Sequence, residues 1–186
     1  MNYNELSNKA HSNSVKHGFW GEKWSNEHCL MLVITEIGEL VDADRKDCHA
    51  DRYEYMRCSK TAWAFETFVK NTVEDEFADI AIRLFDLAGH LGVDFDKMNP
   101  CRYHRAFDKF TFSENAFALC KGLSRDVIGI EKRIQFGVEY VRKWAETLKV
   151  DLEWHIQHKM KYNENRPPLH GKKYQANGMQ LHSIYI

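Results

Sequence analysis

Residues that interrupt helices are scarce in this sequence. Its 186 residues include three prolines and ten glycines, the two types that most disfavour a helix interior, so long helices are favoured. Hydrophobic residues make up 44% and charged residues 28% of the chain, a balance typical of globular proteins rather than of disordered or fibrous ones. A chain of this length supports one full hydrophobic core, so we expect one compact domain.

The five cysteines form no recognisable pattern. No two of them are spaced as C-x-x-C, and pairing them would leave one over. This argues against a disulfide framework and against a thiolate zinc site, and it indicates a reducing compartment.

Long apolar runs and an excess of one charge are also lacking. The longest apolar run, Cys29 to Ile34, is too short for a signal core or a membrane span. A formal net charge of -1 gives no global field that would hold nucleic acid or an anionic membrane. We therefore expect a cytoplasmic protein without a stable nucleic-acid or membrane partner, whose anionic ligands are small.

Helical periodicity dominates the chain, and no strand pattern of useful length is present. Apolar residues recur at steps of three and four, and capping and breaking residues set the helix ends. The predicted helices cover about 3–17, 25–46, 73–91, 114–121, 127–149 and 152–163. Ser25 is an expected N-cap, 47–59 is interpreted as a polar connection, and Thr72 to Asp75 resembles a capping box. The predicted fold class is all-α.

Two of the predicted helices carry the same pattern of core and acid positions. The segments VITEIGEL (33–40) and VEDEFADI (73–80) lie forty residues apart. In each, the apolar residues form the buried stripe of a helix, and two acids lie together on its shoulder. The acids are Glu36, Glu39, Glu76 and Asp79.

If these two helices pack side by side, four carboxylates converge beside a hydrophobic wall. Their repulsion would be costly unless cations neutralise it, and all-oxygen ligation suits Mg²⁺ or Mn²⁺. The acids could instead be solvated residues of ordinary amphipathic helices, as most Glu-x-x-Glu pairs are. A di-iron carboxylate bundle would need Glu-x-x-His, and none of the ten histidines stands in that relation to a glutamate.

The acid pairs, followed by Leu-Gly-Val-Asp at 91–94, resemble the MazG-like family of all-α nucleoside triphosphate pyrophosphatases. That superfamily also includes dimeric dUTPases and dCTP pyrophosphatases. The resemblance extends to Lys159-Met160-x-x-Asn163-x-x-Arg166 and to the basic tail His-Gly-Lys-Lys at 170–173.

The resemblance implies that the four acids hold Mg²⁺, with Mn²⁺ as an alternative. The reaction it implies converts a (d)NTP and water into a (d)NMP and pyrophosphate, as in the cleaning of nucleotide pools. A carboxylate not fully used as a ligand could accept the proton of the attacking water. The resemblance also leads us to expect a homodimer or a higher homo-oligomer.

Six further residues are proposed from the resemblance or their chemistry as nucleotide contacts: Lys159, Asn163, Arg166, His11, Trp20 and Lys172. Lys159 and Arg166 are suited to phosphate, although each could simply solvate a helix end. Trp20 could stack on a base, or it could be a core or lid residue. His155 and His158 share a helix face, and without a third ligand nearby they are interpreted as a solvated pair.

Nearly sixty residues separate 91–94 from the helix of Lys159, whereas short members of the family have almost none. Residues 148–153 echo 91–96 at an offset of 57, which suggests a degenerate second half; an unrelated helical insertion is the alternative. The offset puts Arg133 at the place of Glu76 and Phe136 at that of Asp79, so the second half could not bind Mg²⁺ in the same way. The domain then divides into a metal-site half (1–97), repeat-like or inserted helices (98–150), and a nucleotide-contact helix with a basic tail (151–186).

Two other functions fit the sequence. A catalytically silent helical regulatory or binding protein would use the acids for solubility alone. An enzyme of the same fold could instead act on diphosphates or on alarmone-like nucleotides. Pocket shape decides between such substrates.

Overall fold

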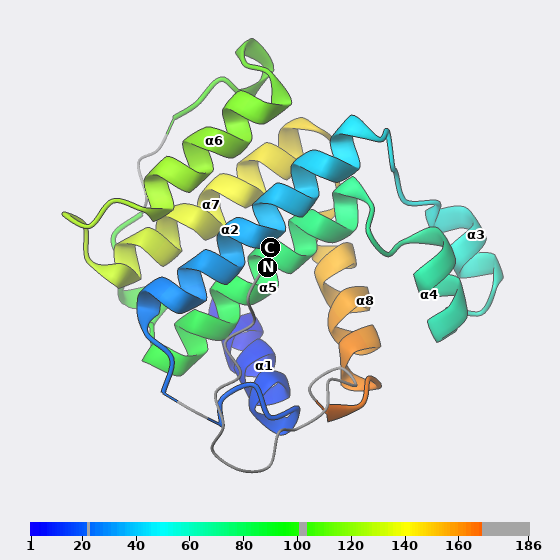
Figure 1. Cartoon of the computed structure of the whole chain (residues 1–186), viewed down its shortest axis with the longest axis horizontal. Helices are drawn as coiled ribbons and strands as arrows, with labels where there is room; N and C mark the ends of the chain where they lie inside the picture. The colour runs from blue at the N-terminus through cyan, green and yellow to red at the C-terminus, as the bar shows by residue number, and fades with distance from the viewer. Residues whose placement is uncertain (22, 101–103, 169–186) are drawn as a thin grey trace, which may run out of the picture.

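The chain folds into a bundle of helices, seen in a computed structural model that describes residues 1–21, 23–100 and 104–168 (Figure 1). These residues contain eight α-helices, two 3₁₀ turns and no strand, which confirms the all-α class. The α-helices are α1 (Tyr3–Lys16), α2 (Asn26–Arg45), α3 (Arg52–Arg57), α4 (Ala62–Phe68), α5 (Val73–Leu91), α6 (Phe112–Leu123), α7 (Ile130–Thr147) and α8 (Leu152–Glu164). Within this part of the chain, no helix combines the length and the apolar character needed to cross a bilayer.

Helix α5 lies at the centre of the bundle. It packs against α1, α2, α7 and α8. Figure 1 shows α2, α5, α6 and α7 running side by side, with α1 and α8 in the lower part of the view. Its core side chains Phe77, Ile80 and Leu84 have no exposed surface. Each contributes roughly 1.5–3 kcal/mol of hydrophobic stabilisation, so the register of α5 is firmly set.

The ends of α2 and α5 follow the predicted signals, with one exception. The Ser25 side chain accepts a hydrogen bond from the His28 N–H at 3.1 Å, and α5 ends at Gly92 with φ of +66°. Thr72 caps α5 by accepting from the Asp75 N–H at 3.3 Å. The predicted capping box there is nevertheless wrong in its second half, because the Asp75 carboxylate accepts from the Asn71 N–H at 3.1 Å instead of returning to Thr72.

The stretch interpreted as a polar connection, 47–59, contains a helix that the sequence analysis missed. Helix α3 pairs with α4 to form an arm that stands to one side of the bundle (Figure 1). Tyr55 of α3 and Phe65 of α4 are buried in a small core of their own. Helices α6 and α7 were predicted in the correct places, but α6 is longer and α7 shorter than expected.

The offset of 57 extends to backbone conformation. Lys149, like Gly92, has a positive φ, of 60° against 66°. The Val93 N–H donates to Ala88 O at 3.0 Å, and 57 residues later the Val150 N–H donates to Ala145 O at 2.9 Å. Helices α5 and α7 therefore end in the same way, and a common origin of the two halves stays a prediction.

In α7, Arg133 and Phe136 lie at the positions that correspond to Glu76 and Asp79 of α5. Their surroundings differ from a cluster of carboxylates. Arg133 is buried and its Nη1 donates to the Leu123 carbonyl at 3.4 Å. Phe136 is half-buried, and its ring covers Gly122 so closely that an added Cβ there would lie 2.0 Å from ring atom Cε1.

Candidate metal and nucleotide site

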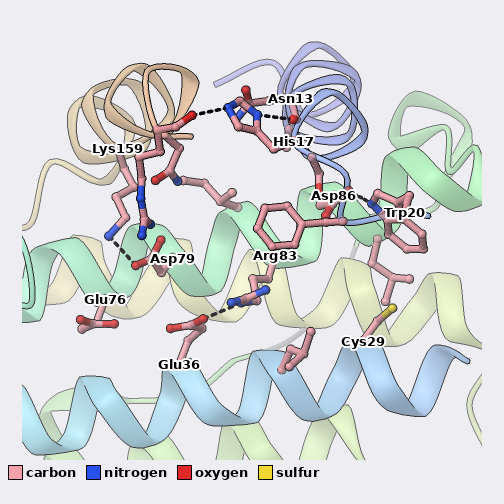
Figure 2. A pocket seen from close by; sticks show the side chains of 18 of the residues that line it. Asn13, His17, Trp20, Cys29, Glu36, Glu76, Asp79, Arg83, Asp86 and Lys159 are labelled. Atoms are coloured by element: carbon pink, nitrogen blue, oxygen red, sulfur yellow. Dashed lines mark hydrogen bonds and ion pairs between the residues drawn. The ribbon is translucent and has the colours of Figure 1, made fainter. Parts of the chain in front are cut away.

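The pairing of α2 with α5 brings three of the four predicted acids together. Oxygen atoms of Glu36, Glu76 and Asp79 all lie within 4.8 Å of one another. Figure 2 shows Glu36 and Glu76 between the two helices and Asp79 beside them on α5, facing Lys159. Glu36 and Glu76 are only 7% and 3% exposed. The fourth acid, Glu39, is exposed and lies outside this cluster, on the wall of the adjoining pocket.

Two of the three carboxylates, those of Glu76 and Glu36, lie where negative charge is unfavourable. Burial, together with the nearby charges of Asp79 and Asp75, raises the pKa of Glu76 to about 8. Burial also raises the pKa of Glu36, although Arg83 opposes the shift. Oxygen Oε2 of Glu76 is buried and accepts no hydrogen bond from the described residues. A proton or a cation at this point would remove the cost.

Arg83 is a member of the site that the sequence analysis did not identify. Its Nε donates to Oε1 of Glu36 at 2.5 Å, which ties α5 to α2. Arg83 follows Asp79 by four residues on α5, and residues at that spacing lie on the same helix face. That spacing was the signal that could have identified it.

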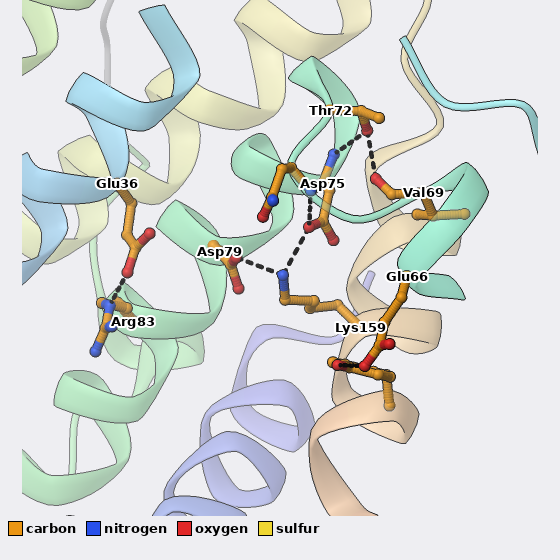
Figure 3. Close-up of polar contacts among 10 residues, drawn as sticks. Glu36, Glu66, Val69, Thr72, Asp75, Asp79, Arg83 and Lys159 are labelled. Carbon is orange, nitrogen blue, oxygen red and sulfur yellow. Dashed lines mark hydrogen bonds and ion pairs between the residues drawn. The ribbon is translucent and has the colours of Figure 1, made fainter. Parts of the chain in front are cut away.

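Lys159 is held by two carboxylates in the interior. Its Nζ lies 2.7 Å from Oδ2 of Asp75 and 2.6 Å from Oδ2 of Asp79 (Figure 3). Asp75 is fully buried, and burial raises its pKa although Lys159 opposes the shift. Lys159 therefore lies in the site, where its charge neutralises two acids, and its contact with a nucleotide phosphate stays a prediction. Asp75 was missed by the sequence analysis.

A pocket of about 420 Å³ opens beside the acid cluster. Its lining includes three cations, Lys70, Arg83 and Arg166, together with the three acids. It also includes aromatic and apolar side chains, those of Phe19, Trp20, Trp24, Leu32 and Ile82. Asn163 also lines the pocket, and its buried Oδ1 accepts no hydrogen bond within the described chain. The pocket thus offers both charged side chains and flat apolar surface.

His11 and Trp20 meet at a single acidic side chain. Nε1 of Trp20 donates to Oδ1 of Asp86 at 2.8 Å, and Nδ1 of His11 lies 2.9 Å from the same oxygen. The Trp20 ring stacks on His90 with ring centroids 3.9 Å apart, so a base could use only its other face. Trp20 lines the pocket, whereas His11 lies outside the lining, beside Trp20.

Three other candidates lie elsewhere or differ from the prediction. Lys172 falls outside the described residues. The interpretation of His155 and His158 as a solvated pair is wrong, because His155 is 2% exposed and burial lowers its pKa to about 4. His158 is half-buried and stacks on Trp154 at 3.9 Å between ring centroids. His158 takes part in the aromatic packing between α8 and the α3–α4 arm through Tyr55, whereas the His155 ring lies against Trp154 of the same helix.

Comparison of the chain with protein-family models, with curated proteins and with solved structures finds no match.

Proposed function

We propose that the protein is a Mg²⁺-dependent nucleoside triphosphate pyrophosphohydrolase, which converts a (d)NTP and water into a (d)NMP and pyrophosphate. The observation that carries the proposal is the cluster of Glu36, Glu76 and Asp79, whose oxygens lie within 4.8 Å of one another at the edge of a 420 Å³ pocket. The choice of product follows from the family resemblance of the acid motifs.

The residues present fit a hard divalent cation. All three candidate ligands are carboxylates, the donor type that Mg²⁺ and Mn²⁺ prefer. Oxygen Oε2 of Glu76 is buried and accepts no hydrogen bond from the described chain, so it is available as a ligand. When bound, the ion would supply charge neutralisation for the substrate phosphates.

Two cationic side chains of the pocket, Lys70 and Arg166, would bind the substrate phosphates. Lys70 and Arg166 line the same pocket as the three acids, and a guanidinium or an ammonium suits phosphate oxygens. Phosphoryl transfer depends mainly on such positioning and charge stabilisation. These two side chains would orient the triphosphate with its reacting phosphorus toward the acids.

Glu39 is the acid best placed to move a proton. It is exposed, it lies on the pocket wall, and it is outside the three-oxygen cluster. A carboxylate that is not engaged as a ligand can accept a proton from the attacking water. We assign this role to Glu39.

The test is an incubation of the protein with Mg²⁺ and a panel of canonical and modified nucleotides, followed by chromatography of the products. The expected products are the nucleoside monophosphate and pyrophosphate. Direct release of orthophosphate, with no pyrophosphatase present, would contradict the proposal. Glu76→Gln is expected to abolish turnover, whereas Glu27→Gln, an exposed acid on α2 outside the pocket lining, should leave it unchanged.

A catalytically silent binding protein is the second candidate. The observation that favours it is that Arg83 and Lys159 already neutralise Glu36 and Asp79 from within the chain. Such a protein should show no Mg²⁺-linked rise in melting temperature, whereas an ion that binds only the folded state must raise it. A thermal melt with Mg²⁺ and with EDTA separates the two candidates.

A further inference from the structure

Asp86 lies in the pocket two helical turns beyond Asp79. Both residues are on α5 and both line the pocket. Seven residues at a rise of about 1.5 Å per residue place them roughly 10 Å apart along the helix. Asp86 therefore marks the end of the pocket that is remote from the acid cluster, and Figure 2 shows it beside Trp20.

Within the described part of the chain, the two oxygens of Asp86 differ in their partners. Oδ1 accepts from Nε1 of Trp20 at 2.8 Å and lies 2.9 Å from Nδ1 of His11. A carboxylate oxygen can only accept, so His11 donates through Nδ1. No hydrogen bond to Oδ2 is formed by the residues that the structure describes. The two donors fix the orientation of the carboxylate.

The surroundings of Asp86 suit a flat ring. Trp20 is held in place from behind by the parallel ring of His90, with centroids 3.9 Å apart. Leu32 and Ile82 add apolar surface to the same pocket. A nucleobase in this end of the pocket would lie against apolar and aromatic surface while its edge approached Asp86.

We propose that Asp86 selects nucleotides whose base carries an exocyclic amino group, such as cytosine or adenine, over those with a carbonyl at that position. The free oxygen is an obligatory acceptor with negative charge, so it is matched by an amino group and repelled by a carbonyl. The imide N–H of uracil is flanked by two carbonyls. If this N–H approached the carboxylate, the two carbonyl oxygens would approach it as well and would be repelled. A buried polar group left without a partner lowers affinity strongly, and this is what gives such sites their selectivity. The inference rests on the proposed function only in taking the ligand to be a nucleotide.

The experiment compares pairs of ligands that differ only in this group. Dissociation constants for CMP and UMP are measured by calorimetry in EDTA, and kcat/KM for CTP and UTP is measured with Mg²⁺. The wild-type protein should favour the cytosine compound by about tenfold to a hundredfold, the range expected for a hydrogen bond to a charged group. ATP against ITP gives the matched purine pair.

Asp86→Asn is the decisive variant. Its Oδ1 still accepts from Trp20 and His11, while the amide nitrogen now offers a donor to the base, so the preference should fall to near one or invert toward uracil. Asp108→Asn, an exposed acid outside the pocket lining, is the matched control and should keep the wild-type ratio. If Asp86 only holds Trp20 and His11 in place, Asp86→Asn would keep the wild-type preference for the cytosine compound over the uracil compound. That result would overturn the inference.

The outcomes separate this inference from the proposed function. If no triphosphate is hydrolysed but the preference for binding CMP over UMP falls in Asp86→Asn, the enzyme proposal fails and the base-reading role stands. Equal binding of CMP and UMP by the wild type overturns the base-reading role by itself, even if Asp86→Asn does not fold. Hydrolysis of CTP and UTP with equal efficiency likewise overturns it and leaves the enzyme proposal intact.

Discussion

Lys159 and Asp75 form a buried ion pair that joins α8 to α5, with Nζ 2.7 Å from Oδ2. Neither side chain is more than 7% exposed. The same ammonium lies 2.6 Å from Asp79, so the pair connects the packing of α8 to the charge of the acid cluster. Removing one partner would leave an uncompensated charge in the interior, and this is more costly than removing both.

Lys159→Met is therefore expected to lower the free energy of unfolding by about 3–5 kcal/mol, because Asp75 is left buried without its cation. The double variant Asp75→Asn with Lys159→Met should recover much of that loss. Urea denaturation of the wild type, both single variants and the double variant gives the coupling energy. Losses that simply add would show that the two charges do not interact.

Stability without metal should fall as the pH rises. The pKa of Glu76 is raised from 4.5 to about 8 in the folded protein, so between these values the folded state binds more protons than the unfolded state. Stability then decreases with pH across this window, by at most about 1.4 kcal/mol per pH unit for one group, and Glu36, whose pKa is also raised, adds in the same direction. Melts in EDTA from pH 5 to pH 8 would show it, and a rise in melting temperature over that range would contradict the assignment.

Glu76→Gln should separate stability from function. The amide keeps the shape of the side chain and removes the buried charge, so the variant is expected to melt at a higher temperature than the wild type in EDTA near pH 8. It should also lose the Mg²⁺-dependent rise in melting temperature. Glu27→Gln provides the control, since Glu27 is exposed on α2 and lies outside the cluster. A full Mg²⁺ response in Glu76→Gln would remove this residue from the metal site.

The fold could be predicted where local signals act alone. Thr72 and Gly92 mark the ends of α5 at Val73 and Leu91 as the structure has them, and the apolar stripe of α5 sets which acids face α2. The helix α3 was missed because its six residues are too few to show a helical period. Its single buried residue, Tyr55, packs against Phe65 of α4 and Trp154 of α8, which are contacts that only tertiary packing creates.

The site could be predicted in part for the same reason. Glu36, Glu76 and Asp79 follow from matched register on two helices that pack together. Asp75 has no such signal, since it lies next to Glu76 and turns toward α8, whose approach no local pattern specifies. Asp86 lies two turns beyond Asp79 on the same face, but its role depends on Trp20 and His11, which reach it from outside α5.

The second half of the bundle should act on stability and not on metal affinity. Nη1 of Arg133 donates to the Leu123 carbonyl at 3.4 Å and lies 3.6 Å from Asp126. Arg133→Ala removes both contacts, and a loss of about 1–3 kcal/mol is expected for the buried carbonyl left without its donor. Phe136→Ala should cost less than the roughly 3–5 kcal/mol of a fully buried phenylalanine, because the ring is only half-buried over Gly122.

Mg²⁺ titrations alongside urea denaturation of these two variants decide the point. A guanidinium repels Mg²⁺ and a phenyl ring cannot ligate it, so neither residue can contribute a ligand where α7 repeats the register of α5. Both variants should therefore bind Mg²⁺ with the wild-type affinity while they unfold at lower urea concentrations. Weakened Mg²⁺ binding with unchanged stability would show that α7 takes part in the metal site. That outcome would contradict a bundle in which α2 and α5 alone form one metal site.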